Sequence, residues 1–136
     1  MATDTLVSAN NRGKSFKKFD LDLKFGEKWE DFVVDKLKTA EVKTEKDKWK
    51  KTGNIAIEYE CNGKPSGIDK TESDFWIHIL SNGSGNYCKL VFDVSMLKRI
   101  VEKYKPTHSR MIGDRGVSNC VLIPLEELFM KENVEL

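Results

Sequence analysis

The sequence is poor in the residues that build structural metal centres and disulfide frameworks. It contains three cysteines and two histidines in 136 residues, and Cys61, Cys88 and Cys120 are too far apart to form a CxxC pair. A structural zinc site is therefore not expected. Three isolated cysteines are typical of reduced thiols in a reducing compartment. His78 lies within an apolar run, which predicts a packed strand residue.

Long hydrophobic runs and an excess of one charge are also missing. No run approaches the roughly 18 apolar residues of a membrane-spanning helix, so we expect no membrane span. The first residues, Met1 to Asp4, contain no apolar signal core, which predicts a cytoplasmic protein. The net charge is only +1, so no overall basic field attracts nucleic acid. The length predicts a single domain over residues 15–136, preceded by a flexible arm over residues 1–14.

Charge is nevertheless unevenly distributed along the chain. Residues 12–18 carry four cations and no acid, and residues 43–51 carry five lysines against two acids. The second run also contains Trp49. A basic patch beside an aromatic residue is able to grip a phosphate backbone. A solvated loop explains either run at least as well.

Hydrophobic spacing predicts a mixed α/β fold. The first helix is expected over residues 27–37, after a short extended segment over residues 16–23. The whole order is α-β-β-β-β-α-β-α, with a central mixed sheet of about four or five strands flanked by helices. The remaining predicted elements are strands at 40–45, 54–61, 74–80, 87–92 and 121–123, a helix from Ser95 that stops before Pro106, a loop at 107–118 and a final helical turn at 124–129.

Two of the predicted strands carry charge at alternate positions. Strand period two places Glu41 and Lys43 on one face. If residues 41–45 and 54–61 form a hairpin, Glu41 lies opposite Glu58. Two carboxylates and an ammonium group then meet, which is the combination that a magnesium-dependent phosphodiesterase needs. The same alternation is also typical of the solvated face of a sheet, and spacing alone favours that second interpretation.

Four motifs in a fixed order resemble the PD-(D/E)xK nuclease superfamily, in particular its small phage-encoded members. The predicted order of helices and strands also fits the restriction-endonuclease-like core of that superfamily. The resemblance covers about residues 25–80, and more loosely residues 97–128. The motifs are Glu41-Val42-Lys43, the stretch Thr52–Tyr59 with the sequence TGNIAIEY, the stretch Gly63–Ile68 with the sequence GKPSGI, and the aromatic segment Thr71–Trp76.

The resemblance implies an endonuclease that cleaves DNA with Mg²⁺ or Mn²⁺, in the host cytoplasm if the protein is phage-encoded. Glu41 and Lys43 match the glutamate and lysine of the sheet motif, and Glu30 matches the acid of the first helix. The hairpin register adds Glu58. We therefore predict Glu41, Lys43 and Glu58 as catalytic residues, and Glu30, Glu41 and Glu58 as metal ligands. The predicted DNA contacts are Lys46, Lys48, Trp49, Lys50, Lys51, Lys64 and Ser66.

The chain departs from the superfamily pattern at one position. An aspartate usually lies on a strand well before the Glu-x-Lys tripeptide, but here Asp35 is six residues upstream on a predicted helix. Either Glu41 takes the aspartate role, with Glu58-Tyr59-Glu60 as second motif, or Glu58 substitutes for the missing acid. A third alternative is an inactive nuclease fold that binds nucleic acid or a host protein, as in phage counter-defence, or that has a structural role. Each of these interpretations is compatible with a homodimer.

Overall fold

The computed structural model describes residues 12–135 except 84, 86 and 114, and without the side chains of residues 12–22 and 87. The described part of the chain divides into two compact units, with the boundary between Lys38 and Thr39. In the described part of the chain, no helix has the length and apolar character needed to cross a membrane.

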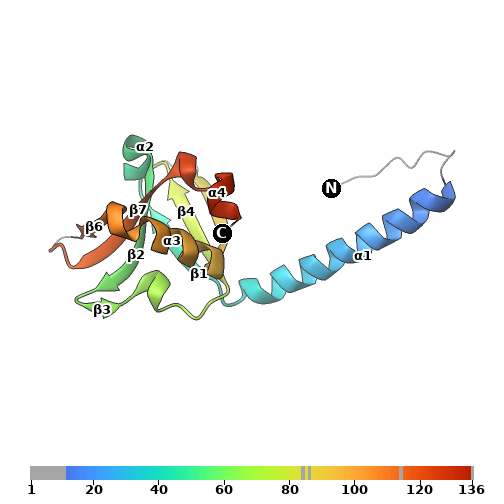
Figure 1. The fold of residues 1–136 in the computed structure, drawn as a ribbon, viewed down its shortest axis with the longest axis horizontal. Helices are drawn as coiled ribbons and strands as arrows, with labels where there is room; N and C mark the ends of the chain where they lie inside the picture. The colour runs from blue at the N-terminus through green and yellow to red at the C-terminus, as the bar shows by residue number, and fades with distance from the viewer. Residues whose placement is uncertain (1–11, 84, 86, 114, 136) are drawn as a thin grey trace. The chain divides into compact units, whose positions relative to one another are not determined.

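The first unit contains one long helix, α1 (Arg12–Leu37) (Figure 1). The expected helix began near residue 27, and the expected extended segment at 16–23 is wrong because it is helical. The reason is the helix propensity of the residues. Between Gly13 and the end of the helix the chain has one glycine, no proline, six lysines and several leucines, and these residues favour a helix over a weakly alternating strand. Of the predicted flexible arm, residues 12–14 are helical and residues 1–11 lie outside the described part.

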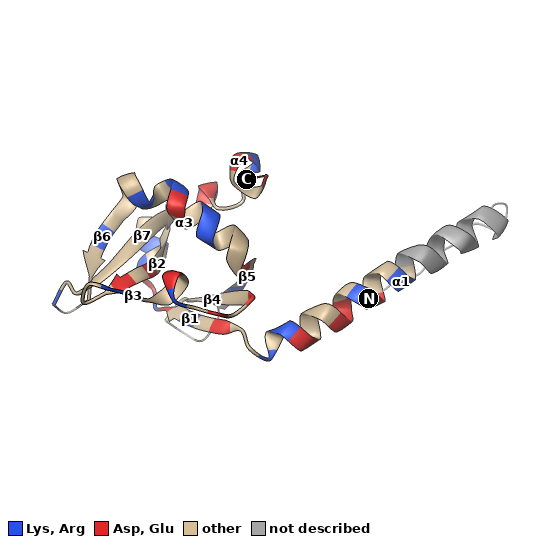
Figure 2. Ribbon diagram, turned by 60° about the horizontal axis from the view of Figure 1, so that its bottom comes forward, with Lys and Arg blue, Asp and Glu red and all other residues tan. Residues whose placement is uncertain are grey.

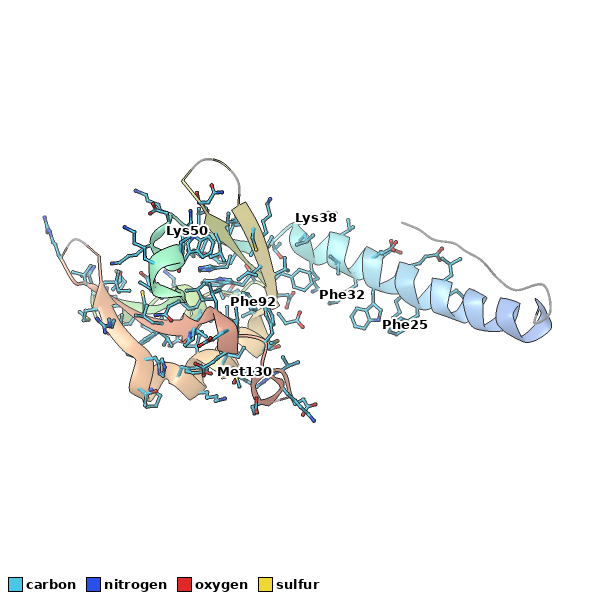
Figure 3. The ribbon with its side chains drawn as sticks, turned by 90° about the horizontal axis from the view of Figure 1, so that it is seen from above. Phe25, Phe32, Lys38, Lys50, Phe92 and Met130 are labelled. Carbon is cyan, nitrogen blue, oxygen red and sulfur yellow. The ribbon has the colours of Figure 1, made fainter. Side chains whose placement is uncertain are left out.

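Aromatic side chains form a stripe along α1. The rings of Phe25 and Trp29 lie 5.9 Å apart, and those of Trp29 and Phe32 lie 5.5 Å apart, both edge-to-face. Figure 3 labels Phe25 and Phe32, and Figure 2 shows acidic and basic residues distributed along the same helix. Spacings of three and four residues place these rings on one side of the helix. Trp29 and Phe32 lie within the helix that was predicted over residues 27–37, and Phe25 precedes it.

The second unit contains two sheets in place of the single central sheet that was predicted. In the first, β1 (Glu41–Glu45) runs parallel to β4 (Phe75–Ser81), which pairs antiparallel with β5 (Tyr87–Asp93). The second is antiparallel throughout, in the order β3-β2-β7-β6. Its strands are β3 (Lys64–Pro65), β2 (Asn54–Cys61), β7 (Ser118–Pro124) and β6 (Ser109–Ile112).

The predicted hairpin between residues 41–45 and 54–61 is wrong. Glu41 is the ladder partner of Trp76, and Glu58 is the ladder partner of Cys120. The connection forms a short helix, α2 (Lys48–Thr52), instead of a loop. Gly53 ends α2 with a left-handed φ of 73° and donates its N–H to the Trp49 carbonyl. A helix in this position replaces the tight turn that a hairpin needs, so the chain enters the other sheet.

The core is built where α3 (Val94–His108) faces both sheets. Leu97, Ile100 and Val101 of α3 are fully buried, and burying such a side chain contributes about 1.5–3 kcal/mol. The helix continues past Pro106, where the sequence predicted its end, and Ser109 Oγ donates to the Lys105 carbonyl at 2.6 Å. The sheet residues of this core are Ile55, Ile57, Trp76, Leu80, Phe92, Val121 and Ile123.

The remaining elements are short. Residues 107–118, predicted as a loop, contain β6, which pairs with β7. A 3-10 turn, η2 (Gly67–Asp69), follows β3. The final helical segment is divided into η3 (Leu125–Glu127) and α4 (Lys131–Val134). The predicted order of helices and strands is recovered with additions, because α2, β3, η2 and β6 were not predicted and α4 lies beyond the predicted turn at 124–129.

The two cysteines Cys88 and Cys120 are expected to differ in reactivity. Cys120 in β7 is 6% exposed, whereas Cys88 in β5 is exposed. Burial raises the pKa of the Cys120 thiol to about 11, and the nearby Glu58 carboxylate acts in the same direction. Because the thiolate is the reactive form, iodoacetamide at neutral pH should alkylate Cys88 and leave Cys120 unmodified in the native protein. Peptide mass spectrometry measures this, and equal labelling of both residues would contradict it.

Candidate functional site

A polar pocket of about 740 Å³ opens where β1 faces the connection between β3 and β4. It brings together two segments that the sequence singled out, the Glu-x-Lys tripeptide and the Ser66-Gly67 pair. The lining residues are Thr39, Glu41, Lys43, Ser66, Gly67, Lys70, Thr71, Glu72 and Ser73.

Glu41 and Lys43 form an ion pair at this pocket. Lys43 Nζ lies 2.7 Å from Glu41 Oε1, and the two side chains are 46% and 32% exposed respectively. Thr71 Oγ1 donates to the other oxygen, Glu41 Oε2, over a long 3.5 Å. An ion pair with this exposure adds at most about 1 kcal/mol to folding stability. The carboxylate of Glu41 is therefore accessible to a ligand at little cost to the fold.

Glu58 reaches the same region through a serine. Ser66 Oγ donates a short hydrogen bond to Glu58 Oε2, and the Ser66 N–H donates to the Tyr59 carbonyl at 3.0 Å. Glu41 and Ser66 both line the pocket, whereas Glu58 is not a lining residue and adjoins the pocket through its hydrogen bond with Ser66. The strands of the two acids are not paired with each other. The chain reversal through β3 and η2, rather than a hairpin, creates this arrangement.

Gly67 allows η2 to approach the backbone of β2 closely. Its φ is 51°, and a Cβ built on it would lie 2.2 Å from the Glu58 carbonyl oxygen. A left-handed φ favours glycine, and no real Cβ comes that near a backbone oxygen. The glycine of the GKPSGI stretch therefore has a structural reason to be there: it lets η2 lie against the backbone of β2 beside Glu58.

Two further predicted acids are placed elsewhere. Glu60 accepts a hydrogen bond from Asn119 Nδ2 at 2.7 Å, and the ladder register shifts between Glu58 and Glu60. That bulge breaks the alternation on which a Glu-x-Glu motif depends. Glu30 is an exposed residue of α1, in the first unit, and is not among the residues that line the pocket.

The donor set is compatible with magnesium. Among the described residues, no group of three or more His, Cys, Asp or Glu side chains is placed to hold a metal ion. Magnesium in phosphoryl-transfer sites is commonly bound by only one or two carboxylates, together with waters and substrate phosphates. Glu41, partly exposed at the pocket, and Glu58, oriented by Ser66, offer hard oxygen ligands of that type.

Similarity to other proteins gives no assignment for this chain. Comparisons with protein-family models, with curated proteins and with solved structures found no match. The resemblance to PD-(D/E)xK nucleases therefore rests on the motifs themselves. Of those motifs, the pocket joins Glu41–Lys43 with the Ser66–Gly67 pair.

The predicted DNA-contacting residues are distributed around α2 and β3. Lys50 and Lys51 are exposed on α2, where Figure 3 labels Lys50, and Lys64 is exposed on β3. Lys46 and Lys48 border a second cavity, of about 650 Å³. Arg110, which was not among the predicted DNA contacts, borders the same cavity. No sequence signal marks Arg110, because it belongs to a short strand within a predicted loop.

A buried histidine, His78, lies on β4 next to β1, where it is the ladder partner of Lys43. His78 is 1% exposed, and its Nδ1 accepts a hydrogen bond from Trp76 Nε1 at 3.2 Å. This contact assigns the proton to Nε2, which lies 3.1 Å from Glu45 Oε1 without hydrogen-bond geometry. Glu45 Oε1 also accepts from the Ala56 N–H of β2. The expected packed strand histidine is confirmed, and Glu45 joins β1 to the neighbouring sheet.

Proposed function

We propose that this protein is a metal-dependent endonuclease that hydrolyses phosphodiester bonds in DNA. The observation that carries the proposal is the Glu41–Lys43 pair at a polar pocket whose opposite wall, Ser66, holds a second carboxylate, Glu58. Metal-dependent phosphodiester hydrolysis uses groups of this kind: carboxylates for a hard cation, and a basic side chain and hydroxyl donors for the phosphate.

The charge of the pocket supports a cation cofactor. Among its lining residues, Lys43 and Lys70 balance Glu41 and Glu72, and the nearby Glu58 adds a further carboxylate. A phosphate group entering this pocket brings more negative charge. A divalent cation held by these carboxylates would offset that repulsion.

Each side chain has a defined role in this proposal. Glu41 and Glu58 would hold Mg²⁺ or Mn²⁺, and Ser66 orients Glu58 by its hydroxyl donation. The bound ion supplies Lewis-acid stabilisation of the phosphate and a lowered pKa for the attacking water. Lys43 neutralises Glu41 before substrate arrives and then holds a phosphate oxygen. The hydroxyl of Thr71, which donates to Glu41 Oε2 in the free protein, would donate to a phosphate oxygen of the bound substrate.

The direct test is DNA hydrolysis by the purified chain. We expect cleavage of plasmid, branched or single-stranded DNA with Mg²⁺ or Mn²⁺, and none with a chelator. Thermal unfolding gives a second readout, because a ligand that binds only the folded state raises the midpoint as its concentration rises. Absence of metal-dependent cleavage on all three substrates would reject the proposal. DNA binding without cleavage would then support the inactive binding protein.

A further inference from the structure

The second cavity has a surface unlike that of the polar pocket. It lies where α2 and β2 face the β6–β7 pair, and its volume is about 650 Å³. Its walls include the apolar side chains of Trp49, Met111 and Leu122, and its charged residues include Lys48 and Arg110. The volume falls within the range of about 300–1,000 Å³ that is typical of sites for small organic groups.

Trp49 provides a fixed aromatic surface in this cavity. Its indole N–H donates both to the Ser81 carbonyl, at 2.6 Å, and to the Lys46 carbonyl, at 2.8 Å. The ring is partly buried and packs against the core. An aromatic ring held in place loses little conformational freedom on binding. Stacking of a base on such a ring contributes about 1–3 kcal/mol.

The cations at this cavity are free to contact a polyanion. Lys46, Lys48 and Arg110 are all exposed. The carboxylate at the cavity, Glu45, has its Oε1 directed to the Ala56 N–H. Apolar walls with exposed cations are complementary to a nucleotide, which has a flat base and an anionic phosphate.

We propose that this cavity receives one unpaired base of the DNA substrate and that Lys48 and Arg110 contact the adjoining phosphates. This inference rests on the proposed function. The bases of an intact duplex are stacked inside the helix and cannot enter a concave site. The preferred substrate therefore has a single-stranded segment next to the cleaved bond.

Strand β1 connects the cavity with the polar pocket. Glu41 and Lys43 line the pocket, and Glu45 on the same strand lines the cavity. Four residues of strand span about 13 Å, which corresponds to about four nucleotides at 3.4 Å per stacked step. A DNA strand whose phosphate lies at the pocket reaches the cavity within a few nucleotides.

Binding without metal tests the cavity separately from the chemistry. The Glu41→Gln protein is titrated with a labelled oligodeoxythymidine and with a duplex of the same length, at fixed salt. We expect tighter binding of the single strand, and Arg110→Glu should weaken it by about tenfold or more while changing duplex binding little. The control is Arg99→Glu, which reverses an exposed charge on α3. Equal loss for both DNA forms, or tighter duplex binding, would overturn the inference.

A second variant tests whether a base occupies the cavity. Met111 is 57% exposed, so Met111→Ser removes apolar wall with little risk to the fold. It should weaken binding of the normal single strand severalfold, and leave binding of an abasic strand with the same phosphates unchanged. Equal effects on both strands would show that no base enters. The DNA-binding measurements test the role of the cavity, and the cleavage assay tests the role of the polar pocket. Failure of one proposal is therefore distinguishable from failure of the other.

Discussion

Glu41→Gln is expected to lower the rate of metal-dependent DNA cleavage by about 100-fold or more. The substitution keeps the side-chain shape but removes the charge that would hold the cation and that pairs with Lys43 at 2.7 Å. Losing one preorganised electrostatic contact in an active site commonly costs a factor of about 10²–10³. Initial cleavage rates at saturating Mg²⁺ measure the effect.

The control for this variant is Glu126→Gln, which makes the same chemical change at an exposed position of η3. Both variants should unfold within about 1 kcal/mol of the wild type, because both acids are partly or fully exposed. Equal cleavage by Glu41→Gln and wild type would remove Glu41 from the chemistry. It would also show that any activity of the preparation comes from elsewhere.

Gly67→Ala is expected to destabilise the fold by about 2–5 kcal/mol. The new Cβ would lie 2.2 Å from the Glu58 carbonyl oxygen, so η2 or β2 has to move. Overpacking costs about 1–3 kcal/mol, and a left-handed φ adds about 1–2 kcal/mol for a residue with a Cβ. Urea denaturation gives the free energy of unfolding.

Gly53→Ala is the matched control for the glycine prediction. Gly53 also has a left-handed φ, of 73°, but a Cβ there would meet no atom within 4 Å. Its loss of stability should be about 1–2 kcal/mol, from backbone strain alone. The difference between the two variants measures the contact between η2 and β2. If both lose the same stability, the close approach at Gly67 has no energetic importance.

The sequence located most helices and strands of the second unit, because each shows its own periodicity. Alternating apolar residues marked β4 at residues 75–81, and three- and four-residue spacing marked α3. Strand pairing cannot be predicted in the same way. The two-residue period of side chains shows which face of a strand is buried, but it does not show which strand is its neighbour. The partner of β1 is β4, more than thirty residues later in sequence. The hairpin that proximity in sequence favoured was therefore wrong.

The same holds for the candidate site: its short motifs could be found in the sequence, but the contacts between distant segments could not. The Glu-x-Lys motif and the Ser66-Gly67 pair were visible in the sequence, and both border the pocket. The pairing of Glu58 with Ser66 depends on the reversal through β3 and was not foreseen. Arg110 was missed because β6 is four residues long and mostly exposed, so it has no hydrophobic signature.

The two walls of the pocket belong to different sheets. Glu41 and Lys43 come from the β1–β4–β5 sheet, and Ser66 follows β3 of the other sheet. In the described part of the chain no backbone ladder joins the two sheets, and side chains such as Glu45 connect them. A ligand that touches both walls therefore acts as a crosslink. Hydrogen exchange should slow in β1 and β2 together when such a ligand binds.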